Sequence, residues 1–155
     1  MKWNDNPDKL ESMALCGRMK IDRVLTIHDW YDGPRLGIAE LDGIPHIYEA
    51  EFDYSTGEYG DTYYLSPVEQ GLLKLILEDW EIWSRWQAKY KNGEVALDTH
   101  PALPEDRPRH ETLKRELEGR LVTDPACRIY LRGRFLHGKP ADNRDGYSVE
   151  WLSVD

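Results

Sequence analysis

Three side chains of this sequence, chosen for their types and positions, are candidates for acid–base chemistry: His28, His46 and Asp79. An imidazole changes its charge near neutral pH, so a histidine can serve as a general base or as a metal ligand. A carboxylate that accepts a hydrogen bond from an imidazole orients the ring for either task. These three residues are our catalytic candidates, provided that the fold brings them together.

A hairpin signal predicts that His46 faces a small residue. The pair Asp42-Gly43 is typical of a two-residue turn between antiparallel strands. Such a turn puts Ala39 opposite His46 and Gly37 opposite Tyr48, because the turn fixes which residues face each other. The small residues leave room beside the larger ones, so we expect a shallow furrow on this face of the sheet.

The other histidine joins this furrow in only one strand register, in which Asp29 faces Ile38. His28 then lies on the other side of Ala39, whereas a slip by one residue moves it to the opposite face. Alternatively, both histidines are partly buried and bonded to the backbone. Neither His-x-His nor Glu-x-x-His spacing supplies another ligand, so we predict no metal and no cofactor. The predicted furrow comprises His28, Trp30, Gly37, Ala39, His46 and Tyr48.

Asp79 lies on the side of a predicted helix that should be apolar. Residues 66–93 are predicted to form one long helix, in which Leu72, Ile76 and Trp83 fall on one line at about 100° per residue. Asp79 projects only about 40° from that line. A carboxylate there must be paired, hydrogen-bonded or protonated. Two interpretations stay open: a dyad with one of the two histidines, or an acceptor for a tryptophan N–H, an arginine or loop backbone.

The same helix has start and stop signals in the sequence. Ser66 can cap its N-terminus, Pro67 suits the first helical position, and Glu69 completes a capping box. Asn92-Gly93 supplies the stop signal. We therefore expect the helix to occupy the whole of residues 66–93.

Two predicted strands carry charges of opposite sign on one face. Glu49, Glu51 and Asp53 alternate with apolar residues, so we expect a solvated outer face, although such carboxylates can also bind a metal or act on a glycoside. Arginines at two-residue spacing form a basic ribbon suited to phosphate or an acidic partner. The ribbon can instead guard a sheet edge or pair with the acidic segment. It comprises Arg128, Tyr130, Arg132 and Arg134.

The composition limits the classes of partner. The formal net charge is -9 over 155 residues, and six Trp and nine Tyr stand against two Phe. An acidic surface argues against a nucleic-acid partner and favours a basic protein. Trp and Tyr suit interfaces because each combines a large apolar face with a polar group.

Cysteine content, hydropathy and absent motifs indicate the cellular compartment and exclude several enzyme classes. Cys16 and Cys127 are too few for a disulfide framework and lack metal-ligand spacing. No apolar run is long enough for a bilayer and the N-terminus has no signal-peptide core, so we expect a cytoplasmic protein with no membrane partner. There is no Gly-rich phosphate loop and no Gly-x-Ser-x-Gly motif, which argues against kinase, NTPase, dehydrogenase and serine-hydrolase activities.

The expected order of elements, βββ-α-α-ββ, indicates an α+β fold. Its antiparallel sheet consists of an N-terminal three-stranded meander and a C-terminal hairpin, packed on the long tryptophan-rich helix and a shorter one. Residues 21–155 form this single domain, and residues 1–20 are a flexible or weakly helical extension. Strands are expected at 23–31, 35–41, 44–53, briefly at 62–65, and at 127–136 and 147–154, with the shorter helix at 109–121.

The leading functional hypothesis is a non-catalytic interaction protein that neutralises or docks on a basic protein, as immunity and inhibitor proteins do. Small size, acidity and abundant Trp and Tyr favour it. Its surface would combine Tyr54, Tyr59 and Tyr63 with the nearby acids. The alternative is a small enzyme or ligand-binding domain that uses the furrow together with Asp79. A third hypothesis assigns a phosphate or RNA contact to the arginine ribbon.

Overall fold

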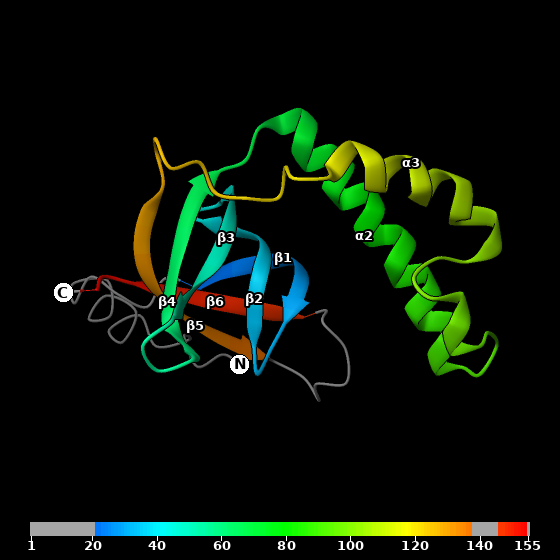
Figure 1. Cartoon of the computed structure of the whole chain (residues 1–155), viewed down its shortest axis with the longest axis horizontal. Coiled ribbons are helices and arrows are strands. Elements are labelled where there is room, and N and C mark those ends of the chain that lie inside the picture. The colour runs from blue at the N-terminus through cyan, green and yellow to red at the C-terminus, as the bar shows by residue number, and fades with distance from the viewer. Residues whose placement is uncertain (1–20, 138–145, 155) are drawn as a thin grey trace, which may run out of the picture. The chain divides into compact units, whose positions relative to one another are not determined.

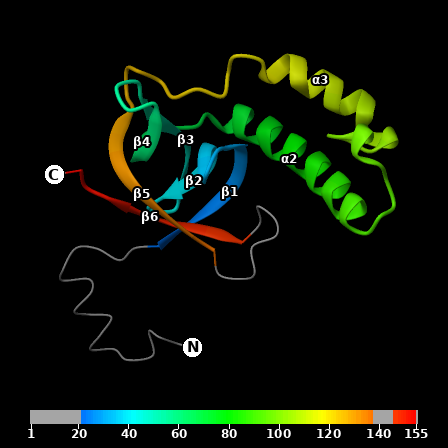
Figure 2. The ribbon, with the colours of Figure 1, turned by 60° about the horizontal axis from the view of Figure 1, so that its bottom comes forward.

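Six antiparallel strands close into a barrel in the computed structural model, which describes residues 21–137 and 146–154. Each strand pairs with the next in the chain, and the last strand returns to pair with the first, so the sheet closes on itself (Figures 1 and 2). The strands are β1 (Ile21–Trp30), β2 (Pro34–Leu41), β3 (Ile44–Asp53), β4 (Glu58–Pro67), β5 (Ile129–His137) and β6 (Tyr147–Leu152).

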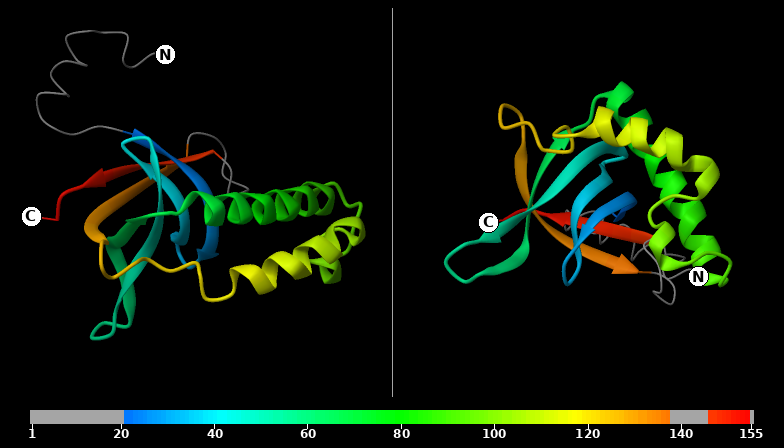
Figure 3. Two further views of the ribbon diagram at one scale, coloured as in Figure 1. Left: turned by 90° about the horizontal axis from the view of Figure 1, so that it is seen from above. Right: turned by 45° about the vertical axis from the view of Figure 1, so that its right-hand side comes forward.

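The helices occupy the connection between β4 and β5. The chain divides into two compact units: residues 67–122 hold the helices, and the described residues before and after them hold the strands. Within the helical unit α3 runs alongside α2, as the left view of Figure 3 shows. The helices are α2 (Gln70–Lys91) and α3 (Arg107–Leu117), with short 3-10 turns at Leu97–Thr99 and Pro104–Asp106.

The predicted fold class was wrong, because the sheet is a closed barrel and not an open sheet of a meander plus a hairpin packed on a long helix. The main local error concerns β4, which was expected only at 62–65 but extends over Glu58–Pro67. A strand of that length links the N-terminal strands to β5. Closure through β1 and β6 joins residues more than a hundred positions apart, which no local pattern reports. The extension predicted for 1–20 lies outside the described residues, and the single domain over 21–155 stays a prediction.

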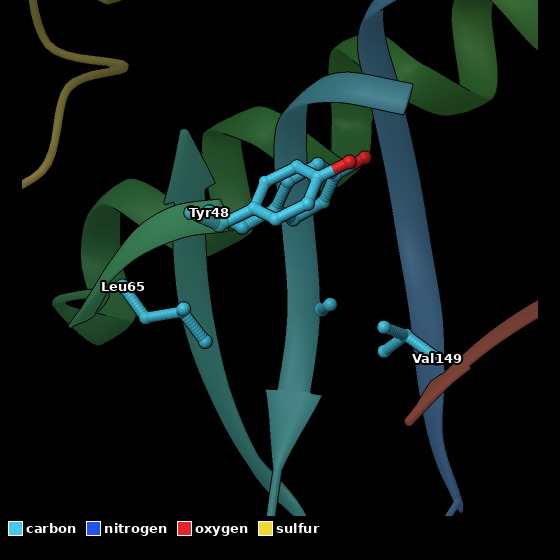
Figure 4. Close-up of a cluster of buried hydrophobic side chains, with 5 residues drawn as sticks. Tyr48, Leu65 and Val149 are labelled. Carbon is cyan, nitrogen blue, oxygen red and sulfur yellow. The ribbon is translucent and has the colours of Figure 1, made fainter. Parts of the chain in front are cut away.

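Aromatic side chains fill the inside of the barrel. Alternate residues of each strand point inward, and Tyr48, Leu65 and Val149 from three strands point toward one another (Figure 4). Tyr48 and Tyr63 are nearly inaccessible to solvent, and the rings of Phe135 and Trp151 pack against both. A barrel of this size is therefore a packed core that aromatic rings occupy.

Two glycines give these rings their space. The hydroxyl of Tyr48 donates to the carbonyl of Thr26 over 3.1 Å, and a Cβ on Gly37 would lie 2.2 Å from that carbonyl oxygen and 2.7 Å from the hydroxyl. A Cβ on Gly133 would lie 2.5 Å from the indole of Trp151 and 3.0 Å from the ring of Tyr63. The space beside these two glycines is therefore filled by core side chains and backbone, and no open furrow remains.

The strand registers confirm one predicted pairing and correct the other. Ala39 faces His46 and Gly37 faces Tyr48, as the Asp42-Gly43 turn predicts. Across the other edge of β2, however, Ala39 faces Val24. The register shifts at several points along β1, where extra residues interrupt the regular pairing. Such irregularities leave no mark in the hydrophobic alternation.

The same correction applies to the residues around His28. Asp29 faces Leu36, whereas the predicted register required Ile38, whose partner is Thr26. His28 therefore does not lie beside Ala39. The predicted furrow of two histidines on either side of one alanine does not form.

The long helix begins later than predicted and ends at Lys91, directly before the predicted stop signal. Ser66 and Pro67 complete β4, and the carboxylate of Glu69 caps the helix by accepting from the backbone N–H groups of Gly71 and Leu72. The helix stops before Asn92-Gly93, and Gly93 adopts the left-handed conformation with φ of 76°.

We expect Gly133→Ala to destabilise the barrel by about 1–3 kcal/mol, because the new methyl group must displace the Trp151 indole. Urea unfolding followed by fluorescence measures the change. Gly60→Ala is the matched control: its Cβ meets nothing within 4 Å, and it makes the same change in the unfolded chain. Equal stabilities of the two variants would contradict the packing that Gly133 is inferred to permit.

Candidate functional site

The carboxylate of Asp79 forms a carboxylate–imidazole pair, but its partner is not one of the predicted histidines. Nδ1 of His110 lies 2.9 Å from Oδ1 of Asp79, and the two side chains are 12% and 22% exposed. The pair joins α3 to α2 inside the helical unit. Sequence reasoning therefore identified the kind of interaction that Asp79 needs and missed the residue that supplies it.

Neighbouring ion pairs indicate that Asp79 has a structural role. Glu78 accepts two hydrogen bonds from Arg109, at 2.6 and 2.8 Å, beside the Asp79–His110 pair. Further along, Arg85 donates to both carboxylate oxygens of Asp106 at 3.0 Å. The order Glu78–Asp79 on one helix matches Arg109–His110 on the other. That complementary spacing is the sequence signal that could have identified His110.

The predicted histidine furrow is absent for a second reason, which is that its members have other partners. His46 is buried and its Nδ1 donates to the carbonyl of Ile44 over 2.7 Å. Tyr48 lies in the barrel core, and Trp30 lies at the end of β1 with 42% of its surface exposed. The structural interpretation of His46, a partly buried histidine bonded to the backbone, fits this arrangement.

Aromatic residues, some exposed and some half-buried, instead gather at one end of the barrel. Because the strands alternate in direction, the β1–β2 turn, the β3–β4 turn and the residues flanking the β5–β6 connection all lie at the same end (Figure 1). The β3–β4 turn projects beyond the other strands in the left view of Figure 3. We call this end of the barrel the aromatic rim, and it consists of Trp30, Tyr31, Phe52, Tyr54, Tyr59 and Tyr147.

The rim residues contact one another through their rings. The Tyr59 ring lies 6.0 Å from Tyr31 and 5.0 Å from Phe52, and Phe52 lies 4.9 Å from Tyr54. Trp30 and Tyr147 form a second pair at 5.8 Å. Despite these contacts, Tyr54 remains 89% exposed and Tyr31 68% exposed. The rim therefore presents aromatic faces to solvent.

Arg35 fixes the two turns of the rim to each other. Its guanidinium donates to the carbonyls of Tyr31, Asp32 and Gly60 at 2.7, 2.8 and 3.2 Å. The same group lies over the Tyr59 ring, 4.7 Å from its centroid. One side chain thus holds the β1–β2 turn against β4.

An acidic hollow of about 500 Å³ opens at the base of the β3–β4 turn. The hydroxyl and backbone N–H of Ser55 donate to Asp53, and these bonds hold the pKa of the Asp53 carboxyl below its usual range. The Asp53 carboxylate is therefore charged at neutral pH. The lining residues are Glu51, Phe52, Asp53, Tyr54, Thr56, Glu58, Tyr59, Gly60 and Thr62.

Glu51 is held by hydroxyl groups on the outer face of the barrel. Tyr130 donates a hydrogen bond to it, and Tyr64 and Thr62 each donate over 3.2 Å. These bonds, that of Tyr130 above all, lower the pKa of Glu51. The bond to the carboxylate raises the pKa of Tyr130, and burial followed by the same carboxylate raises that of Tyr64.

The arginine ribbon pairs within the chain. Arg132 lies 3.5 Å from Asp61 and Arg134 lies 3.5 Å from Glu150. Arg128 stacks over the Tyr64 ring, 4.0 Å from its centroid. These contacts match the interpretation in which the ribbon pairs with acidic residues of the same chain.

Tyr63 does not lie on the binding surface that was predicted from the sequence. Its ring is 3% exposed, and its hydroxyl donates to the carbonyl of Pro34 over 2.9 Å. Tyr54 and Tyr59, in contrast, belong to the rim. Tyr31 was missed, although its position before Asp32-Gly33 marks it as a turn residue.

We expect Asp79 and His110 to be coupled by about 1 kcal/mol in a double-mutant cycle of alanine substitutions, because each removes one partner of the same hydrogen bond. Urea unfolding monitored by tryptophan fluorescence supplies the four free energies. Glu81, exposed on the same helix, is the control, and its cycle with His110 should show no coupling. Independent effects of Asp79→Ala and His110→Ala would contradict the pairing.

We expect Tyr130→Phe to raise the pKa of Glu51 toward its ordinary value, because the strongest donor to that carboxylate is lost. A lowered pKa in the folded state stabilises the protein above the unfolded-state pKa, and this stabilisation disappears as the pH falls through the folded-state pKa. The variant should therefore lose stability at neutral pH and little in acid.

A carboxyl ¹³C NMR titration of Glu51 measures its pKa, and urea unfolding at several pH values measures the stability. Tyr54→Phe, which removes an exposed hydroxyl, serves as the control. An unchanged Glu51 titration in Tyr130→Phe would show that the hydroxyl does not hold the carboxylate.

Comparison with known proteins assigns no function. No family model matches this chain, and no curated protein or solved structure matches it. Within the described ranges, no helix is long and apolar enough to span a bilayer. Among those same residues, no group of three His, Cys, Asp or Glu side chains is placed to hold a metal ion. The geometry of the aromatic rim is therefore the basis for a functional proposal.

Proposed function

We propose that this protein is a non-catalytic interaction protein that binds a basic protein partner through the aromatic rim. The observation that carries the proposal is the gathering of aromatic side chains at one end of the barrel, where Trp30, Tyr31 and Tyr54 are exposed and the other members of the rim are half-buried. Clustered exposed aromatic surface is costly in water and marks interaction sites. Tyrosine and tryptophan also dominate the binding energy of protein interfaces.

The rigidity of the rim supports this role. Arg35 ties the β1–β2 turn to β4 through three backbone carbonyls, and the rings contact one another in a fixed arrangement. A surface that is ordered before binding loses little conformational entropy when a partner docks. The rim therefore has the pre-organisation that tight recognition requires.

The charge around the rim favours a basic partner. Asp29, Asp32, Asp53 and Glu58 are exposed in or beside its turns, and the whole chain carries a net charge of -9. Such a surface attracts cationic proteins and speeds their encounter. An immunity or inhibitor protein, which must capture a basic target quickly, is the class that this combination fits best.

The alternative, a small enzyme or ligand-binding domain with a His/Asp/aromatic pocket, has less geometric support. His46 is bonded to backbone, Tyr48 belongs to the core, and Asp79 is bonded to His110 in the helical unit. The residues that the pocket would need therefore have separate structural roles and do not meet in one site. Binding at the rim is the function that the described geometry favours.

We expect Tyr54→Ala and Tyr31→Ala each to weaken partner binding by roughly tenfold or more, as removal of an interface hot spot does. The partner is first captured from the source cell at low salt, and its affinity for the purified variants is then measured by calorimetry. Both side chains are largely exposed, so the fold should survive.

Ile44→Ala is the matched control, because Ile44 is a 58% exposed apolar residue at the opposite end of the barrel. Its affinity for the partner should equal that of the wild type. Failure to recover a stoichiometric partner at low salt, or equal affinities for all three variants, would contradict the proposed function.

A further inference from the structure

We infer that the acidic hollow beside Tyr54 and Tyr59 receives an arginine side chain of the partner. This inference rests on the proposed function, because it assigns a specific recognition task to part of the same rim. The hollow combines an exposed aromatic face with carboxylates, and it is open to solvent at the projecting β3–β4 turn. These two features match the two ways in which a guanidinium is bound by proteins.

The aromatic part of the hollow can stack a planar cation. Phe52 meets both Tyr54 and Tyr59 edge to face, with interplanar angles of 73° and 76°. This packing places both tyrosine rings beside Phe52. Arg35 already covers the Tyr59 ring, whereas Tyr54 is 89% exposed. The Tyr54 ring is therefore the surface on which an incoming guanidinium would lie.

The carboxylates complete the recognition. Hydrogen bonds lower the pKa of both Asp53 and Glu51, so both are anionic at neutral pH. Glu58 stands exposed at the start of β4 on the same lining. A guanidinium stacked on Tyr54 would have these acids within its reach, and its several N–H groups can donate to more than one of them.

The barrel already uses the same chemistry for its own arginines. Arg35 lies 4.7 Å above the Tyr59 ring and Arg128 lies 4.0 Å above the Tyr64 ring. Arg128 also stands beside an acidic site, since the tyrosine it covers donates to Glu51. An arginine on a tyrosine next to a carboxylate is therefore an arrangement that this sheet supports internally.

Other occupants fit the hollow less well. An anion would be repelled by its charged acids. Among the described residues, no group of three His, Cys, Asp or Glu side chains is placed to hold a metal ion. A lysine ammonium stacks less well on an aromatic face and donates from a single point. Arginine alone uses both the ring and the separated acids.

A peptide titration tests the inference on the full-length protein. The probes are the peptide acetyl-Gly-Ser-Arg-Ser-Gly-amide and two analogues in which citrulline or lysine replaces arginine. Citrulline keeps the planar shape and removes the charge. Two-dimensional NMR follows the backbone amides of residues 51–62, and we expect shifts there with the arginine peptide, weaker ones with lysine and none with citrulline.

Two variants locate the binding. We expect Glu58→Gln and Tyr54→Ala each to weaken binding of the arginine peptide roughly two- to fivefold, the usual effect of one exposed ion pair or one stacking contact. Glu105→Gln, which neutralises an exposed acid in the helical unit, is the control and should leave the affinity unchanged. The amide spectra of the free variants report directly that each is folded.

The outcomes separate this inference from the proposed function. If the arginine and citrulline peptides shift the same amides equally, or if neither shifts them, the arginine inference is overturned. The rim could then still bind its partner, as the Tyr31→Ala result would show. If the arginine peptide binds but Tyr31→Ala and Tyr54→Ala leave partner binding unchanged, the proposed function fails and the hollow keeps its preference for arginine.

Discussion

The packing of four aromatic rings inside the barrel is the interaction on which the rest of the structure depends. Every pair among Tyr48, Tyr63, Phe135 and Trp151 lies at a centroid distance between 5.3 and 6.3 Å. Rings of this size fit because Gly133 on β5 and Gly37 on β2 carry no Cβ. The rings come from four consecutive strands, β3 to β6, so their mutual contacts require the sheet to curl around them, and the pairing of β1 with β6 completes the closure. Closure in turn brings the turns of the barrel together at its ends.

This core determines where recognition can take place. Because side chains occupy the interior, aromatic residues that do not fit inside must lie at the strand ends or on the outer face. On the outer face, tyrosine hydroxyls are bound to Glu51 and arginines are paired with acids. At the rim, by contrast, Tyr31 and Tyr54 retain most of their exposure. The same residue type thus serves the core, the outer network and the surface, according to its position in the strand.

Local features of the fold could be predicted from the sequence, and those that depend on distant contacts could not. The Asp42-Gly43 turn set the β2–β3 register, and Asn92-Gly93 marked the helix end, because each acts through its own backbone. The irregular pairing of β1 and the closure by β6 depend on partners far along the chain. For the same reason the sequence showed that Asp79 needs a partner but not that His110, 31 residues away, supplies it. Tyr54 and Tyr59 were identified as surface candidates, whereas Tyr63, four residues after Tyr59 on the same face of β4, lies deeper in the barrel and is buried, a difference that local alternation does not report.

The acidic side chains of the two units differ in their partners, and this difference distinguishes the rim from the helical unit. In the helical unit, the charge of Glu78 is compensated by Arg109 at 2.6 Å, and Asp79 is hydrogen-bonded to His110. The exposed acids of the β3–β4 turn are different, because Asp53 is held by neutral hydroxyl and backbone groups, which stabilise its charge without cancelling it. Salt screens electrostatic attraction beyond about 8 Å at physiological ionic strength. Under the proposed function, a basic partner would therefore be attracted by the acids of the rim chiefly at short range, where the aromatic faces of Tyr31 and Tyr54 would add to the contact.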